Sequence, residues 1–126
     1  MSQETPGIVI VDRRIDPADL RRLVELYFED MVKVVVDVRR RVAAVGGELH
    51  SDAEQALLER GSLQADLWGA NYYPGRGPED CIEYTALINI RPSLNNRSME
   101  IQDPDVRRAV LDITHSLIGR GEKLTS

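Results

Sequence analysis

Residues 31–38 read Met-Val-Lys-Val-Val-Val-Asp-Val, and this stretch decides the fold. Valine occupies every second position from Val32 to Val38, so the segment is predicted to be a β-strand with one fully apolar face. The arginine triplet Arg39–Arg41 then forms a turn, and Val42–Leu49 is predicted to return as a second strand. The sequence therefore predicts a β-hairpin over residues 31–49.

The register of this hairpin stays open, because a change of one residue in the loop length reverses the face of the returning strand. With a turn of even length, Ala43, Val45 and Leu49 join the valine face, and Glu48 and His50 lie on the other. The direction of Glu48 and His50 thus depends on the turn.

Two Asp-Pro pairs mark helix starts on either side of the hairpin. Asp16 and Asp103 each precede a proline, which disfavours the α conformation in the residue before it and fits the first helical position. Apolar residues follow at helical spacing, through about Phe28 after the first pair and to near Gly119 or Gly121 after the second. Both segments are predicted amphipathic helices.

A third helix is predicted after the hairpin. Ser51–Glu54 matches a capping box, in which the serine hydroxyl caps the third amide and the glutamate reaches back to the serine amide. The short helix runs to Arg60 and stops at Gly61, a residue type common just after helix ends.

Three further segments are predicted strands: Gly7–Asp12, Leu63–Tyr73 and Cys81–Arg91. The last two flank Pro74–Pro78, a loop containing two prolines and two glycines. The resulting order, β-α-β-β-α-β-β-α, has strand pairs joined by short turns. It predicts an α+β fold with a largely antiparallel sheet of about five strands and three helices packed on one face.

Length and composition fit one globular domain. The chain has 126 residues, 42% hydrophobic and 29% charged, close to the commonest domain size and to ordinary globular composition. We expect a single domain over residues 7–121, a flexible N-terminal tail at 1–6 and a C-terminal tail at 122–126.

Charge and cysteine content narrow the classes of protein. A net charge of −5 argues against a dedicated nucleic-acid binder, which normally shows a basic face. The single Cys81 cannot form an internal disulfide, which makes the cytoplasm the default location. No signal peptide is visible, and the aliphatic runs are too short to cross a bilayer. We expect a soluble protein that binds neither membranes nor nucleic acid.

Several short blocks resemble a small prokaryotic protein family of unknown function. The blocks are Gly46–Glu54 (GGELHSDAE), Asp66–Gly69 with Asn71, Tyr73 and Pro74, Ile88–Pro92 (INIRP) and Asn96–Ser98 (NRS). The resemblance covers roughly residues 8–118. It implies no activity, because no activity is established for that family.

The first polar cluster lies in the Gly46–Asp52 tract. On a strand, Glu48 and His50 would point to the same face. Together with Asp52 they could bind a divalent metal, or a carboxylate could orient the imidazole for proton transfer. Metal sites need three or more converging ligands, and only two here have a predictable direction. We therefore predict no metal and no cofactor, and keep Glu48 and His50 as catalytic candidates.

The second cluster spans the end of the last predicted strand, where Asn89 and Arg91 share one face, and the loop after Pro92. Arginine's planar guanidinium suits carboxylate or phosphate, whereas asparagine and serine are also ordinary turn formers. Acidic neighbours from Glu100 to Asp105 could simply neutralise the arginines. The ligand-binding candidates are Asn71, Asn89, Arg91, Asn96, Arg97 and Ser98.

The remaining distinctive side chains have packing roles in this interpretation. Trp68 and Tyr72 share one face of a predicted strand, with Asn71 on the other, and such aromatic pairs usually pack in a core or an interface. Cys81 is predicted to be a buried, inert thiol, and His115 an exposed residue of the last helix.

Three functions remain open, and the sequence does not decide whether the protein is an enzyme. The leading hypothesis is a binding or regulatory domain for a small anionic ligand or a protein partner. The second is a metal-assisted or acid–base hydrolase centred on Glu48 and His50. The third is a structural homo-oligomer that associates through a sheet edge or the Trp68–Tyr73 segment.

Overall fold

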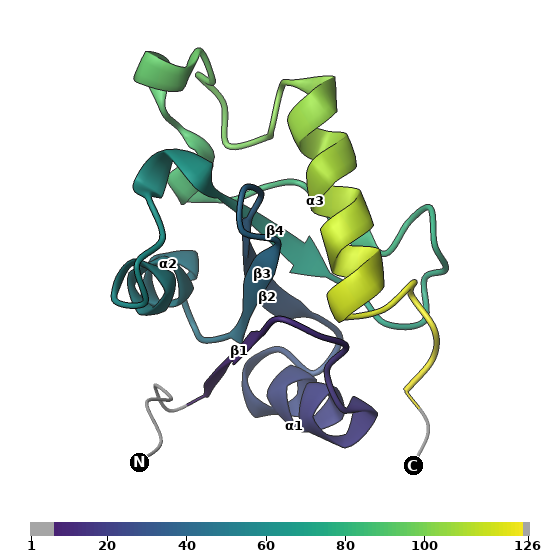
Figure 1. Ribbon diagram of the computed structural model, residues 1–126. Coiled ribbons are helices and arrows are strands. Elements are labelled where there is room, and N and C mark those ends of the chain that lie inside the picture. The colour runs from purple at the N-terminus through teal and green to yellow at the C-terminus, as the bar shows by residue number, and fades with distance from the viewer. Residues whose placement is uncertain (1–6, 125–126) are drawn as a thin grey trace.

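The computed structural model describes residues 7–124, which form an antiparallel sheet covered by helices (Figure 1). The sheet has five strands and there are three α-helices, in the predicted order, so the α+β class is confirmed. The predicted N-terminal tail, residues 1–6, lies outside the described residues. The elements are β1 (Ile8–Val11), α1 (Pro17–Tyr27), β2 (Val32–Asp37), β3 (Val42–Gly46), α2 (His50–Leu58), β4 (Leu67–Tyr72), β5 (Ile82–Glu83) and α3 (Pro104–Leu117).

The strands lie in the order β1-β3-β2-β4-β5, and every neighbouring pair is antiparallel. In the central hairpin Asp37 pairs with Val42, which leaves an even turn of residues 38–41. Ala43 and Val45 therefore lie opposite the alternating valines of β2 and on the same face. The even-turn register is the one that forms.

Asp37 accounts for this turn. The residue is fully buried, and its Oδ1 accepts hydrogen bonds from the backbone amides of Arg39 (3.0 Å) and Arg40 (2.8 Å). The other carboxylate oxygen accepts the Ser62 hydroxyl at 2.7 Å. An aspartate that bonds the amides two and three residues ahead is a local turn device. It fixes the loop length and hence the register.

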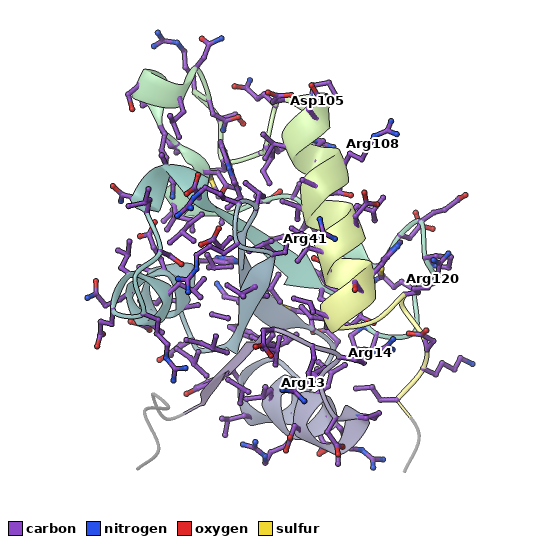
Figure 2. All side chains as sticks on the ribbon, in the orientation of Figure 1. Arg13, Arg14, Arg41, Asp105, Arg108 and Arg120 are labelled. Carbon is purple, nitrogen blue, oxygen red and sulfur yellow. The ribbon has the colours of Figure 1, made fainter. Side chains whose placement is uncertain are left out.

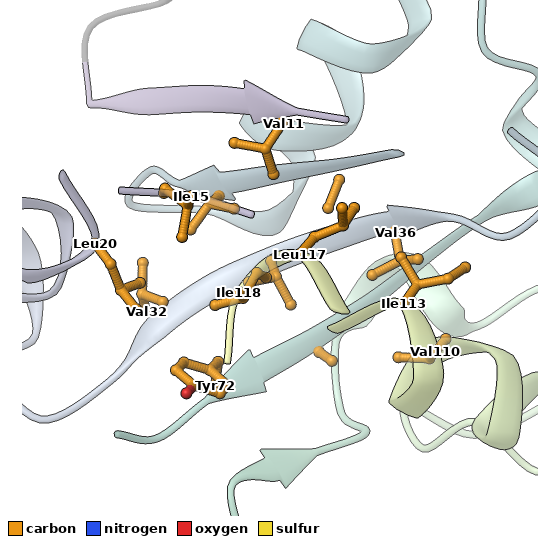
Figure 3. Packing of buried hydrophobic residues seen from close by; sticks show 14 of the residues in the cluster. Val11, Ile15, Leu20, Val32, Val36, Tyr72, Val110, Ile113, Leu117 and Ile118 are labelled. Carbon is orange, nitrogen blue, oxygen red and sulfur yellow. The ribbon is translucent and has the colours of Figure 1, made fainter. Parts of the chain in front are cut away.

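Helices cover both faces of the sheet. The side chains of α1 and α3 pack against the valine face of β2, which holds the larger core (Figure 3). Helix α2 packs on the opposite face, where Val35, Ala44 and Leu67 form a second, smaller core. The prediction of helices on one face only is therefore wrong. The central strands are buried on both sides, a pattern that alternation in β2 alone does not reveal.

Both Asp-Pro helix starts are confirmed. Asp16 Oδ1 accepts the amide of Ala18, and Asp103 Oδ1 accepts the amide of Asp105, each at 2.8 Å. A side-chain acceptor at this position satisfies one of the amides that have no partner within the helix.

The predicted capping box is wrong. Helix α2 begins two residues earlier, at His50, and its N-cap residue is Leu49 in place of Ser51, with no side-chain hydrogen bond. Glu54 does not reach back to Ser51 but bonds Arg91 at 2.9 Å. A tertiary ion pair therefore takes the glutamate that the local pattern assigned to the cap.

Three predicted strands are markedly shorter than expected. The strand predicted over Leu63–Tyr73 begins only at Leu67, because residues 64–66 form a short 3-10 turn. The strand predicted over Val42–Leu49 ends at Gly46, where positive φ angles at Gly46 (109°) and Gly47 (90°) turn the chain away. A Cβ at Gly46 would lie 2.2 Å from the carbonyl oxygen of Gly7, so this close approach requires glycine. The strand predicted over Cys81–Arg91 is limited to Ile82–Glu83, because residues 87–89 and 92–94 form short 3-10 turns.

Within residues 7–124, no helix is long and apolar enough to cross a membrane.

Candidate functional site

Strand β5 pairs only with the last two residues of β4. Before them, side chains in place of a strand form hydrogen bonds with the outer edge of β4. Asn89 is fully buried, and its Oδ1 accepts the Gly69 amide at 2.8 Å while its Nδ2 donates to the Gly69 carbonyl at 2.9 Å. These two bonds are the pair that a neighbouring antiparallel strand would supply. Nδ2 also donates to the Met99 carbonyl at 3.0 Å. The Asn89 amide is therefore committed to the protein's own backbone.

Asn96 organises the loop that follows. Its Nδ2 lies within hydrogen-bonding distance of the carbonyls of Asn89 (2.8 Å), Ser98 (2.9 Å) and Glu100 (3.0 Å). Its Oδ1 accepts the Gln102 amide at 2.8 Å. Ser98 Oγ accepts the Glu100 amide at 3.1 Å. These polar side chains hold the loop in one conformation.

Arg91 is the nearly buried cation of this region. Its guanidinium donates to the Leu67 carbonyl and to Glu54 Oε2, and it lies 5.4 Å from the centre of the Trp68 ring. Only 10% of the Arg91 side chain and 12% of the Glu54 side chain are exposed. Burial lowers the pKa of Arg91, and the Glu54 carboxylate opposes this effect. A guanidinium has five N–H donors, so donors remain for a further acceptor.

A hollow of about 310 Å³ lies beside this ion pair, between α2 and the chain that follows β5. Two of its apolar residues, Ile90 and Leu94, are 44% and 38% exposed. The short helical turns at the upper left of Figure 1 carry much of this region. We call Ile90, Arg91, Leu94 and this hollow the Arg91 surface. The full lining comprises Glu54, Gln64, Ala65, Ile88, Ile90, Arg91, Ser93 and Leu94.

The structure places Glu48 and His50 on different elements. Glu48 is exposed in the bend after β3, whereas His50 is the first residue of α2 and only 8% exposed. His50 Nε2 lies 2.8 Å from the Ala70 carbonyl and therefore carries the proton, since a carbonyl only accepts. Burial lowers the pKa of His50, and nearby Lys33 lowers it further. The imidazole is a neutral, buried hydrogen-bond donor to β4.

Among the described residues, no group of three or more His, Cys, Asp and Glu side chains converges to hold a metal ion. The donor set that a metal-assisted reaction at Glu48 and His50 requires is not assembled in residues 7–124.

Asn71 lies on the α2 face of the sheet, opposite the face of Trp68 and Tyr72, as the alternation predicts. Its Nδ2 donates to Glu83 Oε1 at 2.8 Å, and the Tyr73 hydroxyl donates to the same oxygen at 3.2 Å. Asn71 Oδ1 is buried without a partner among the described residues. The amide links β4 to the short edge strand β5.

Cys81 and His115 meet although they are far apart in sequence. Cys81 is fully buried, as predicted, and its Sγ lies 3.8 Å from His115 Nε2. His115 is half-buried rather than exposed, and Nε2 donates to the Pro78 carbonyl at 3.0 Å. Burial raises the pKa of the Cys81 thiol. The imidazole is thus a donor to a carbonyl and is not set up as a base for the thiol.

A second hollow, of about 280 Å³, was not predicted from the sequence. It lies where the start of α1, the end of β4 and the C-terminal segment meet. Tyr72 is 1% exposed there, and its hydroxyl accepts the Gly121 amide at 2.9 Å. No local signal could have found this hollow, because its lining comes from segments far apart in the chain. The lining residues are Arg14, Ile15, Pro17, Leu20, Tyr72, Ile118, Glu122, Lys123 and Leu124.

Comparisons with known proteins address the family but not the chemistry. Neither the curated proteins nor the solved structures contain a match to this chain. One family model matches residues 9–117, which include all the strands but the start of β1, and all three helices. The chain belongs to the family described as Protein of unknown function (DUF5674).

Proposed function

We propose that this protein is a binding domain whose Arg91 surface receives a segment of a protein partner that carries an acidic residue beside apolar residues. The observation that carries the proposal is the pair of exposed apolar side chains, Ile90 and Leu94, that line a hollow beside the nearly buried Arg91.

Exposed apolar residues concentrate in this part of the molecule. Of the eight large hydrophobic side chains that are exposed among residues 7–124, five lie in the segments 63–65 and 87–99, which supply most of the lining of the hollow. They are Leu63, Leu87, Ile90, Leu94 and Met99, with Leu87 reaching 71% exposure. Exposed apolar side chains gathered on one part of a surface are typical of interaction sites.

The free hydrogen-bond donors of the surface favour an acidic contact. Glu54 balances the charge of Arg91, but the guanidinium retains N–H donors beyond the bonds to Glu54 and Leu67. Arg97 is exposed nearby and makes no ion pair with other residues that the structure describes. Desolvated arginines surrounded by apolar contacts are frequent centres of protein interfaces.

The loop that carries Ile90 and Leu94 is fixed before any partner arrives. Asn89 bonds it to β4, and Asn96 bonds three of its carbonyls. Binding costs conformational entropy when it orders a flexible loop at the interface. A loop that internal hydrogen bonds already hold in place lowers this entropic cost. The asparagines therefore support binding by positioning the surface, and Arg91 supplies the contact.

A selection from random peptides tests the proposal. Peptides that bind the immobilised wild-type protein are identified by display, and their affinities are measured by fluorescence anisotropy. We expect them to combine Asp or Glu with neighbouring apolar residues. The double variant Ile90→Ser/Leu94→Ser should bind them at least tenfold more weakly. The matched control is Leu26→Ser on α1, where the exposed fraction is 51%, and its affinity should be unchanged.

The proposal fails if no peptide is enriched, or if the selected peptides bind the double variant as well as the wild type. Sedimentation of the two proteins at several concentrations separates the homo-oligomer alternative. A dimer present in the wild type and lost in Ile90→Ser/Leu94→Ser would show that a second copy of this chain covers the surface instead. The hydrolase alternative has no comparable support, because Glu48 and His50 lie on different elements and neither lines the hollow beside Arg91 or the hollow beside Tyr72.

A further inference from the structure

The hollow beside Tyr72 is separate from the Arg91 surface, and the two share no lining residue. Its apolar walls come from the α1/α3 face of the sheet. Figure 3 labels four of these residues, with Tyr72 at the end of β4 and Ile15, Leu20 and Ile118 around it. Pro17 and Leu124 complete the apolar lining. Such a surface takes the hydrocarbon part of a ligand.

Tyr72, which lines this hollow, carries a buried hydroxyl whose own proton has no acceptor among the described residues. The Tyr72 hydroxyl accepts the Gly121 amide, and no acceptor for its own proton lies within hydrogen-bonding distance among the described residues. Burial raises the pKa of Tyr72 to about 12, so the phenol stays protonated at neutral pH. A buried hydroxyl that lacks a hydrogen-bond acceptor carries a free-energy penalty, and a ligand atom that accepts its proton removes this penalty on binding.

The charged groups at the mouth favour an anion. Arg14 and Lys123 line the hollow together with one acidic residue, Glu122. The Glu122 carboxylate accepts the Arg120 amide at 2.8 Å and lies 3.7 Å from the Arg14 guanidinium. Hydrogen bonds from backbone amides to this carboxylate lower the pKa of Glu122. Lys123 makes no ion pair with the residues described here. One uncompensated positive charge therefore remains at the entrance, where Figure 2 labels Arg14.

The wall formed by the C-terminal segment is anchored. The amides of Gly75 and Gly77 donate to the Gly121 carbonyl at 3.0 Å each. Gly121 has φ of 74°, and a Cβ there would lie 2.4 Å from the Gly77 carbonyl oxygen. On the other side, the Ile15 amide donates to the Leu117 carbonyl at 2.8 Å. The hollow is thus a fixed feature of the fold, with both walls tied by backbone hydrogen bonds.

From these contacts we infer that the hollow binds a small organic carboxylate. The carboxylate accepts the Tyr72 hydroxyl proton and faces Arg14 and Lys123, and the apolar body lies against Ile15 and Ile118. The volume of about 280 Å³ lies at the lower end of the range for ligand pockets, which begins at roughly 300 Å³, and it suits a short aliphatic chain or a single ring.

Titrations followed by amide chemical shifts test this site. The probes are hexanoate, benzoate and phenylacetate, together with the uncharged amide of each acid and inorganic phosphate. We expect saturable shifts at Ile15, Gly121 and Lys123 with at least one carboxylate. The corresponding amide lacks the charge and phosphate lacks the apolar body, so each should bind at least tenfold more weakly.

Two variants assign the contacts. Tyr72→Phe keeps the ring but removes both the donor and the acceptor of the Gly121 amide, and it should weaken carboxylate binding at least tenfold. Lys123→Glu changes only an exposed side chain, so it tests the charge even if Tyr72→Phe folds poorly, and it should weaken binding several-fold. Arg108→Gln on α3, an exposed arginine outside this hollow, is the matched control and should bind as the wild type does.

The inference is overturned if none of the carboxylates gives saturable shifts at millimolar concentration, or if the amides bind as tightly as the acids. It is also overturned if Lys123→Glu binds the carboxylate with unchanged affinity. None of these results bears on the Arg91 surface, because neither the peptide selection nor its variants involve this hollow.

Discussion

Aliphatic and aromatic side chains pack the sheet face under α1 and α3, whereas the face under α2 buries Asp37, His50 and Asn71 among a smaller set of apolar residues. The buried polar groups of the α2 face bond backbone amides, a carbonyl or the adjacent edge strand. Packing on the first face depends on volume, which tolerates small changes. The second face and the β4 edge beside it depend on directional bonds, which fail when one partner is removed.

The largest expected effect is at the edge of β4. Asn89→Ala leaves the Gly69 amide and carbonyl buried without partners, and each unpaired group costs about 1–3 kcal/mol. We expect the free energy of unfolding in urea to fall by about 4 kcal/mol. Ile113→Val, a loss of one methylene group from the α1/α3 face, should cost about 1 kcal/mol. If the two variants lose the same free energy of unfolding, the proposed difference between the hydrogen-bonded face and the apolar face is wrong.

A pH-dependent effect should follow from His50. Burial lowers the pKa of His50 in the folded state, whereas the pKa in the unfolded state stays at about 6.5. Below that value the unfolded state binds more protons, so stability present at pH 7 is lost as the pH falls toward the folded pKa. Each unit by which the pKa is lowered removes about 1.4 kcal/mol once that pKa is passed.

Urea unfolding between pH 7 and 5 measures this effect. His50→Asn should lose this part of the pH dependence, and His115→Gln should keep it. If the wild type and His50→Asn show the same slope with pH, the buried neutral imidazole is not a source of acid sensitivity.

The smallest expected change in stability is at the helix starts, where α1 has a side-chain cap and α2 has none. Asp16→Ala removes the acceptor for the Ala18 amide and should lower stability by about 1 kcal/mol. Ser51→Ala should change stability by less than about 0.5 kcal/mol, because α2 has no side-chain cap and begins before Ser51. Thermal unfolding of the two variants is sufficient. A larger loss at Ser51 would mean that the capping box forms after all.

Local signals predicted the elements of the α1/α3 face well. The Asp-Pro pairs place α1 and α3, and the valine alternation places β2, because each pattern depends on neighbours within a few residues. The pairing of Ala43 and Val45 with the valine face followed once the turn was even. These are cases in which local propensity and the tertiary fold agree.

The same reasoning failed where a side chain bonds a distant partner. Asn89 and Arg91 looked like two residues on one face of a strand, yet their bonds to Gly69 and Leu67 replace a strand. Glu54 looked like part of a cap and instead pairs with Arg91. In each case the bonding partner is at least 20 residues away, so nothing in the local pattern indicates the choice.

The candidate ligand residues divide along the same line. Asn89, Asn96 and Ser98 were predicted as candidates from their residue types, and their hydrogen bonds are made within the loop or to β4. Arg91 keeps donors for a partner, and Arg97 is exposed. The hydrogen bonds thus separate the residues that hold the proposed surface from those with donors free for the proposed partner.

The sequence by itself determined the order of elements, the caps of two helices and the apolar face of the central strand, because each depends on contacts between near neighbours. Only the tertiary structure decided the side of the sheet on which α2 lies and the partners of Asn89, Arg91 and Glu54. It also decided that Arg14, Tyr72 and Lys123 meet around one hollow. Those features join segments far apart in the chain, and long-range packing selects among partners that local chemistry leaves equivalent.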